Sequence, residues 1–165
     1  MLNVYLAGPF FRPEQRDVIR EAKTLLQING CHVFDPEAES AGIWRGRAPH
    51  DCSSDDRRAV LAMNERGIKG SDLVVAWLRG TGGDFTDQGV VWEMGFASAK
   101  GIPVLGFYVP LRGENVDSLN LMLSESLAGL AQLYELGEAV MLYERDGCDA
   151  VSLFAHYPVL PSEVI

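Results

Sequence analysis

Apolar and polar residues alternate in blocks along the chain, and the blocks have the lengths of strands and helices. Short apolar runs bounded by turn-forming or charged residues predict five strands, at residues 3–7, 31–34, 72–78, 103–109 and 139–143. Longer segments with apolar residues at helical spacing predict helices at residues 13–29, 54–69, 88–100 and 116–136. Strand and helix therefore alternate, which is typical of a parallel sheet covered by helices on both faces.

This alternation predicts an α/β fold. We expect a flavodoxin-like or Rossmann-like three-layer sandwich with a mainly parallel five-stranded sheet, formed by residues 1–165 as a single domain. In such folds ligands bind at the carboxyl ends of the strands. Three predicted loops meet that rule, at residues 8–12, 35–40 and 79–87. Residues 37–54 have mixed charge with scattered glycine and proline, and they predict a mobile loop over the cleft.

Composition narrows the class of ligand. The 165-residue chain has a formal net charge of −9, so it would repel nucleic-acid backbones and anionic membrane surfaces. It has no apolar run of about 18 residues that could span a membrane, and we expect a cytoplasmic protein. Its cysteines and histidines lack the spacing of a disulfide scaffold or a metal site, which leaves no metal expected; they are Cys31, Cys52, Cys148, His32, His50 and His156.

Glu93 is the strongest candidate for chemistry, within the stretch 84–101. It falls in the first turns of a predicted helix, where the helix dipole would keep its carboxylate ionised and able to attack an anomeric carbon. Asp87 could share the cleft and handle a proton. Gly89 and Gly95 indicate a close approach of the backbone to a ligand or a neighbouring helix. From spacing alone, a solvated first-turn glutamate is the simpler interpretation of Glu93.

Four segments change that interpretation, because they resemble the nucleoside 2-deoxyribosyltransferase family in order and separation. They are YLAGPFF at 5–11, GIKGSD at 67–72, DQGVVWEMG at 87–95 and LNLML at 119–123. Together they span about residues 3 to 125. The resemblance implies that Glu93 attacks C1′ and holds the deoxyribosyl group covalently. It also implies that Tyr5 positions Glu93 through its hydroxyl, and that Asp87 is the acid near the departing base and the sugar.

The resemblance implies binding roles as well. Phe10 and Phe11 would lie beside the base, and Gly8 would leave room for the sugar. Asn120 would reach into the site of a neighbouring subunit and bind the 5′-hydroxyl. Asn64 stands where the lactobacillar members have an aspartate thought to protonate the base. Members of the trypanosomatid branch carry asparagine there, so the chain resembles that branch more closely.

The function implied is transfer of 2-deoxyribose from a 2′-deoxyribonucleoside to a free nucleobase, without a metal or organic cofactor. The resemblance also implies a homo-oligomer built from dimers, such as a tetramer or hexamer. One alternative is an N-glycosidase that hydrolyses a nucleoside or a deoxynucleoside 5′-monophosphate on the same fold. Asn120 suits a free 5′-hydroxyl better than a phosphate. A second alternative is a non-catalytic nucleotide or base sensor.

Overall fold

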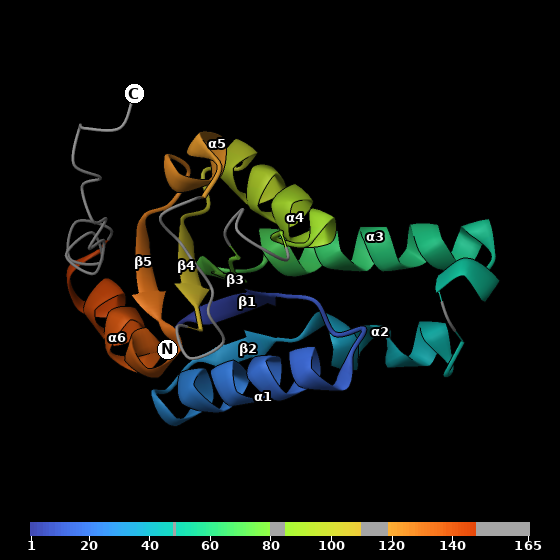
Figure 1. The fold of residues 1–165 in the computed structure, drawn as a ribbon, viewed down its shortest axis with the longest axis horizontal. Helices are drawn as coiled ribbons and strands as arrows, with labels where there is room; N and C mark the ends of the chain where they lie inside the picture. Colours follow the sequence, from blue (N-terminus) through green and yellow to red (C-terminus); the bar gives the residue numbers. More distant parts are fainter. Residues whose placement is uncertain (48, 80–84, 110–118, 148–165) are drawn as a thin grey trace.

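Five parallel strands form a single sheet at the centre of the molecule (Figure 1). The computed structural model describes residues 1–47, 49–79, 85–109 and 119–147. The strand order is β2-β1-β3-β4-β5, which confirms the predicted flavodoxin-like α/β class. The strands are β1 (Asn3–Ala7), β2 (His32–Phe34), β3 (Leu73–Trp77), β4 (Val104–Tyr108) and β5 (Gly129–Gln132).

Helices cover both faces of this sheet and bury alternate residues of each strand. On one face α1 (Pro13–Ile28) and α6 (Leu136–Asp146) pack over strand residues such as Leu6, Val75 and Phe107. On the other face α3 (Ser54–Lys69) and α4 (Gln88–Ala99) pack over Tyr5 and Val74. The central strand β3 is buried at all five positions, so its continuous apolar run is explained by helices on both sides.

The prediction of a mobile loop at residues 37–54 is wrong. It contains the helix α2 (Pro36–Trp44) and the short 3-10 helix η1 (Pro49–Asp51). Asp35 caps α2 by accepting hydrogen bonds from the backbone N–H groups of Glu37 and Ala38. Pro36 follows as the first helical residue, where its missing N–H costs nothing. The Asp-Pro pair is therefore a helix start as well as a strand end.

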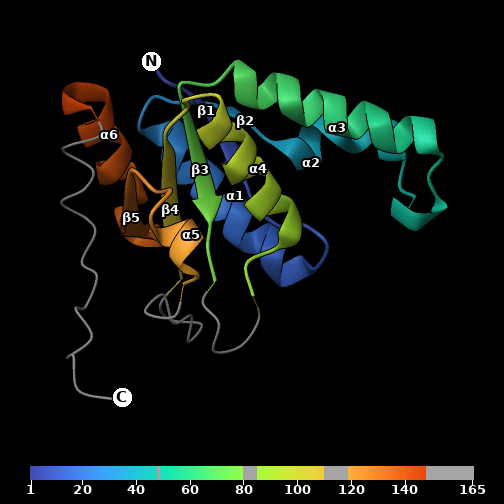
Figure 2. The same ribbon diagram turned by 90° about the horizontal axis from the view of Figure 1, so that it is seen from above.

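Residues 36–47 and 49–61, which we call the α2–α3 arm, extend to one side of the sheet (Figures 1 and 2). The arm comprises α2, η1 and the first half of α3. Ser53 caps α3 by accepting from the backbone N–H of Asp56, as its position in the sequence predicts. The fully buried residues of α3 all lie in its second half, at Met63, Gly67 and Ile68. The helix is thus anchored to the sheet at one end only.

The C-terminal part differs most from the prediction. The helix expected at 116–136 is wrong, because this stretch holds α5 (Leu121–Ser124), β5 and the 3-10 helix η4 (Leu133–Glu135). The strand expected at 139–143 is helical and belongs to α6. Leu130 and Ala131 explain the error, since they point into opposite core layers with the alternation of a strand. The helical spacing of the leucines is therefore coincidental.

Parts of three predictions lie outside the described residues: 48 in the loop 37–54, 80–84 in the loop 79–87, and 116–118 in the expected helix. None of the helices in the described part combines the length and the hydropathy that a bilayer crossing requires.

Candidate active site

Glu93 is a buried carboxylate held by side chains from two other elements. It is the sixth residue of α4, and only 8% of its surface is exposed. The Tyr5 hydroxyl, from β1, donates a hydrogen bond to Glu93 Oε1 at 2.6 Å. The Asn64 side chain, from α3, donates through Nδ2 to the same oxygen at 3.3 Å. The fold thus brings together three residues that the sequence nominated at distant positions.

The environment of Glu93 opposes its charge. Burial raises the pKa of Glu93 to about 7, the hydrogen bond from Tyr5 lowers it, and the charge of Asp87 raises it. The expectation that the helix dipole keeps this group ionised is therefore wrong. The dipole acts within the first turn, whereas Glu93 lies one and a half turns into the helix. Burial and Glu93 also raise the pKa of Tyr5, so its hydroxyl remains a donor.

Asp87 caps the helix that carries Glu93. Its Oδ1 accepts hydrogen bonds from the backbone N–H groups of Gly89 at 2.8 Å and Val90 at 3.3 Å. This cap satisfies donors that have no partner inside the helix. Because the charge of Asp87 also acts on Glu93, the two carboxylates belong to one electrostatic unit, as the six-residue spacing suggested.

A cavity of about 410 Å³ opens beside Asp87 at the carboxyl ends of β1 and β3. Its position agrees with the rule for ligand sites in parallel sheets. The Arg79 guanidinium lies over the Trp77 ring, 5.8 Å from its centroid. The cavity is lined by Pro9, Arg12, Gln15, Trp77, Arg79, Phe85 and Asp87. Arg12 and Arg79 were not nominated from the sequence. Both lie in loops that follow strands, Arg12 after β1 and Arg79 after β3.

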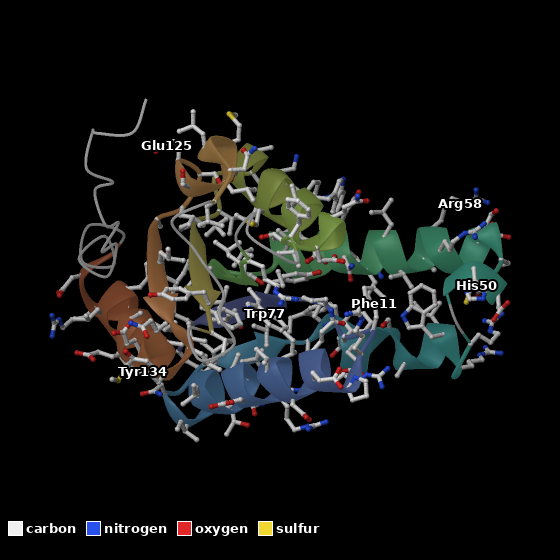
Figure 3. All side chains as sticks on the ribbon, viewed as in Figure 1. Phe11, His50, Arg58, Trp77, Glu125 and Tyr134 are labelled. Carbon is white, nitrogen blue, oxygen red and sulfur yellow. The ribbon has the colours of Figure 1, made fainter. Side chains whose placement is uncertain are left out.

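Phe10 and Phe11 lie in sequence between two residues that line this cavity, Pro9 and Arg12. Their rings pack against each other with centroids 5.1 Å apart. Gln15 holds the turn, because its side-chain oxygen accepts from the backbone N–H groups of Phe11 and Arg12. Phe11 is 57% exposed, and in the view of Figure 3 it lies between Trp77 and the tip of the α2–α3 arm. Phe11, the exposed member of this pair, has surface available for a flat ligand.

Packing against α1 explains why position 8 is a glycine, which the sequence did not predict. A Cβ atom at this position would collide with the side chain of Ile19 and lie 3.8 Å from Cβ of Trp77. The space beside Gly8 is therefore filled by α1 in that direction. The role expected for Gly8 at the sugar stays a prediction.

Asn120 lies at a second cavity, of about 330 Å³, which shares Arg79 and Phe85 with the first. It caps α5, because its Oδ1 accepts from the backbone N–H of Met122 at 2.9 Å. Among the described residues, Glu93 is hydrogen-bonded to Tyr5 and Asn64 alone. Asn120 is thus not joined to Glu93 within the chain. The remaining lining residues are Thr86, Val91, Met122 and Leu123.

Metal ligands are not clustered in the described ranges, which hold no group of three or more His, Cys, Asp or Glu side chains suited to an ion. Burial raises the pKa of Cys31 to about 11, which disfavours a thiolate nucleophile. Glu93 is therefore the described group best placed to act as a nucleophile.

Comparisons with known proteins agree with this fold. They point to an enzyme that acts on N-glycosidic bonds. The model of the nucleoside 2-deoxyribosyltransferase family matches residues 4–123, and the chain belongs to this family. Among proteins with curated functions, none matches this chain.

Solved structures include similar proteins. A 2-deoxyribosyltransferase from Bacillus psychrosaccharolyticus is 27% identical, with a TM-score of 0.66 over 81% of this chain and 89% of its own. A CMP N-glycosidase from Clostridium botulinum is 19% identical, with a TM-score of 0.51 over 85% and 98%. A 2-deoxyribosyltransferase from Leishmania mexicana is 21% identical, with a TM-score of 0.50 over 73% and 83%. The last two likenesses concern the fold alone.

Proposed function

We propose that the protein cleaves the N-glycosidic bond of a 2′-deoxyribonucleoside and transfers the 2-deoxyribosyl group to a free nucleobase. The observation that carries this proposal is the buried carboxylate of Glu93, which accepts hydrogen bonds from Tyr5 and Asn64. A pKa of about 7 leaves part of Glu93 ionised at neutral pH. Burial at the same time limits the access of water, which would compete with the acceptor base.

The reaction has two balanced steps. In the first, a lone pair of the Glu93 carboxylate forms a bond to C1′, and the electron pair of the C1′–N bond leaves with the base, which takes up a proton. In the second, a ring nitrogen of the acceptor base forms a bond to C1′ as the C1′–O bond breaks, and the electron pair of that bond returns to Glu93. The ring nitrogen then loses its proton. Asp87 is the proposed proton donor and acceptor, with its carboxylate at the cavity wall.

The substrate-binding residues follow from the same proposal. Phe10 and Phe11 would stack on the base, which contributes about 1–3 kcal/mol per base in other proteins. Gly8 would contact the sugar through its backbone. Asn64 would place the chain in the branch of the family that carries asparagine at this position. Asn120, exposed on α5, would bind the 5′-hydroxyl in the site of a neighbouring subunit.

A second candidate is hydrolysis of a deoxynucleoside 5′-monophosphate. The observation that favours it is the pair of arginines, Arg12 and Arg79, which both line the cavity of about 410 Å³ beside Asp87. Guanidinium groups bind phosphate through paired hydrogen bonds. A single carboxylate in the same lining, that of Asp87, leaves the cavity with a net positive charge.

One set of incubations separates these activities. We expect deoxyinosine with adenine to give deoxyadenosine and hypoxanthine. Free deoxyribose, formed equally with and without adenine, would indicate hydrolysis, and a preference for deoxyinosine monophosphate would support the second candidate. Glu93→Gln should abolish turnover, whereas Glu138→Gln, an exposed position on α6, should not. Binding of deoxyinosine without turnover by the native protein would reject both and leave a base sensor.

A further inference from the structure

One oxygen of Glu93 carries both hydrogen bonds. Tyr5 from β1 and Asn64 from α3 donate to Oε1, at 2.6 Å and 3.3 Å. Oε2 accepts no hydrogen bond from any residue in the described ranges. The last torsion of a glutamate side chain has broad and shallow minima, so rotamer preference alone would not fix the carboxylate plane. Two donors from separate elements fix it, and they distinguish the two oxygens.

The amide of Asn64 is oriented toward the carboxylate at the expense of its own acceptor. Its Oδ1 is buried and has no hydrogen-bond partner. Leaving a buried acceptor unpaired is unfavourable. Turning the amide over would place Oδ1 against a carboxylate oxygen, which is worse when Glu93 is ionised. The observed orientation is therefore the one that an ionised Glu93 selects.

From this geometry we propose that Asn64 is a positioning residue for Glu93, which fixes Oε1 together with Tyr5 and leaves Oε2 to attack the anomeric carbon. The inference rests on the proposed function for the identity of the attacked atom. It assigns Asn64 to the nucleophile rather than to the base. An amide suits this place because it donates to an ionised carboxylate and can accept from a protonated one.

The side chains around Glu93 determine what a change at Asn64 would do. The titratable groups that act on Glu93 are Tyr5, from β1, and Asp87, at the start of α4. The α3 helix contributes the neutral Asn64. Asn64→Asp would place a third acid in this cluster, within hydrogen-bond distance of Oε1. Two carboxylates this close do not both ionise readily, so the pKa of Glu93 would rise further.

The test is the pH dependence of kcat/KM for deoxyinosine with adenine as acceptor. For Asn64→Asp we expect the acidic limb to move up by at least about one pH unit, which lowers kcat/KM at pH 6 about tenfold or more. Asn64→Leu removes the donor without adding a charge. The acidic limb of its pH profile should therefore move up less than that of Asn64→Asp, while kcat falls and KM changes little. Gln27→Glu makes the same amide-to-carboxylate change on the exposed surface of α1 and should leave the profile unchanged.

Failure of this inference differs from failure of the proposed function. An acidic limb that stays in place in Asn64→Asp, with only the KM for one base altered, would assign Asn64 to the base and overturn the inference. If the native protein cleaves no deoxynucleoside, a carbon-13 NMR titration of the Glu93 carboxyl group still decides. Equal Glu93 pKa values in native protein and folded Asn64→Asp would overturn the inference. Circular dichroism establishes that the variants are folded.

Discussion

The carboxyl group of Glu93 couples the chemistry of single residues to the stability of the fold. Its pKa rises from 4.5 to about 7 on folding, mainly through burial. Between these two values the folded protein binds more protons at Glu93 than the unfolded chain does. Stability contributed by this group is therefore lost as the pH rises through this window, and above about pH 7 the ionised group is a constant cost.

Glu93→Gln should remove this cost while keeping an acceptor for the Tyr5 hydroxyl. We expect the variant to be more stable than the native protein above pH 7, by at most about 3 kcal/mol, and the difference to shrink toward pH 4.5. Urea unfolding at pH 5 and pH 8 measures it. Glu138→Gln, on the exposed surface of α6, serves as the control. A stability difference for Glu93→Gln that is the same at both pH values would contradict the argument.

The residues of the site could be nominated from the sequence, but their interactions could not. Spacing nominated Asp87 and Glu93, and the family resemblance added Tyr5. The structure joins Tyr5 to Glu93 by a hydrogen bond. Burial of Glu93 depends on packing between α3, α4 and β1, which has no local sequence signal, so its raised pKa was not predictable. The contact from Asn64 to Glu93 was missed for the same reason, since 29 positions separate them.

At the level of elements, Asp87 has one role as the cap of α4 and another as a charge beside Glu93. Two substitutions separate these roles. Asp87→Ser retains a capping oxygen and should stay near native stability, whereas Asp87→Ala should lose about 0.5–2 kcal/mol. Because the charge of Asp87 raises the pKa of Glu93, both variants should lower that pKa. Urea unfolding measures the first effect and a carbon-13 NMR titration of Glu93 the second, and equal stability of both variants would exclude the cap.

Two helical glycines differ in what surrounds them. A Cβ atom at Gly67, on α3, would lie 2.6 Å from the Phe34 ring, and Phe34 in turn stacks on Tyr5. A Cβ atom at Gly95, on α4, would meet nothing described within 4 Å, so no neighbouring helix in the described part of the chain approaches closely there. Gly67→Ala should cost about 1–3 kcal/mol through overpacking. Gly95→Ala should instead gain about 0.5–1 kcal/mol of helix stability, provided no partner covers it. Thermal unfolding of both variants gives the comparison, and similar shifts would contradict it.

Four of the five strands and the three long helices α1, α3 and α4 were predictable because each carries its own periodicity and boundary residues. The exceptions have a physical cause. The fifth strand has four residues, Gly129–Gln132, and is too short for its alternation to stand out among leucines at helical spacing. It forms by pairing with β4, a contact that the local sequence does not encode. The helix α2 was hidden because the Asp35-Pro36 pair also resembles a turn.

At the scale of the whole molecule, apolar side chains are exposed around the second cavity. Val91 and Trp92 on α4 and Leu121 and Met122 on α5 are between 37% and 76% exposed. Val91 and Met122 line the same cavity as Asn120, and we call the surface around these three residues the α4–α5 face. Contiguous exposed apolar surface of this kind is typical of protein contacts. This face therefore supports the proposed homo-oligomer in which Asn120 enters a neighbouring site.

Met122→Glu tests this arrangement, because it places a charge in the α4–α5 face, next to the cap residue Asn120. If two copies associate through this face, burying the new carboxylate should raise the dissociation constant by about tenfold or more. Activity per subunit should then fall on dilution, since each site would need a residue from its neighbour. Met141→Glu adds the same charge at a 48% exposed position on α6 and should leave assembly intact. Sedimentation velocity and activity over a dilution series measure both effects. A native protein that is active as a monomer at micromolar concentration would exclude a shared site.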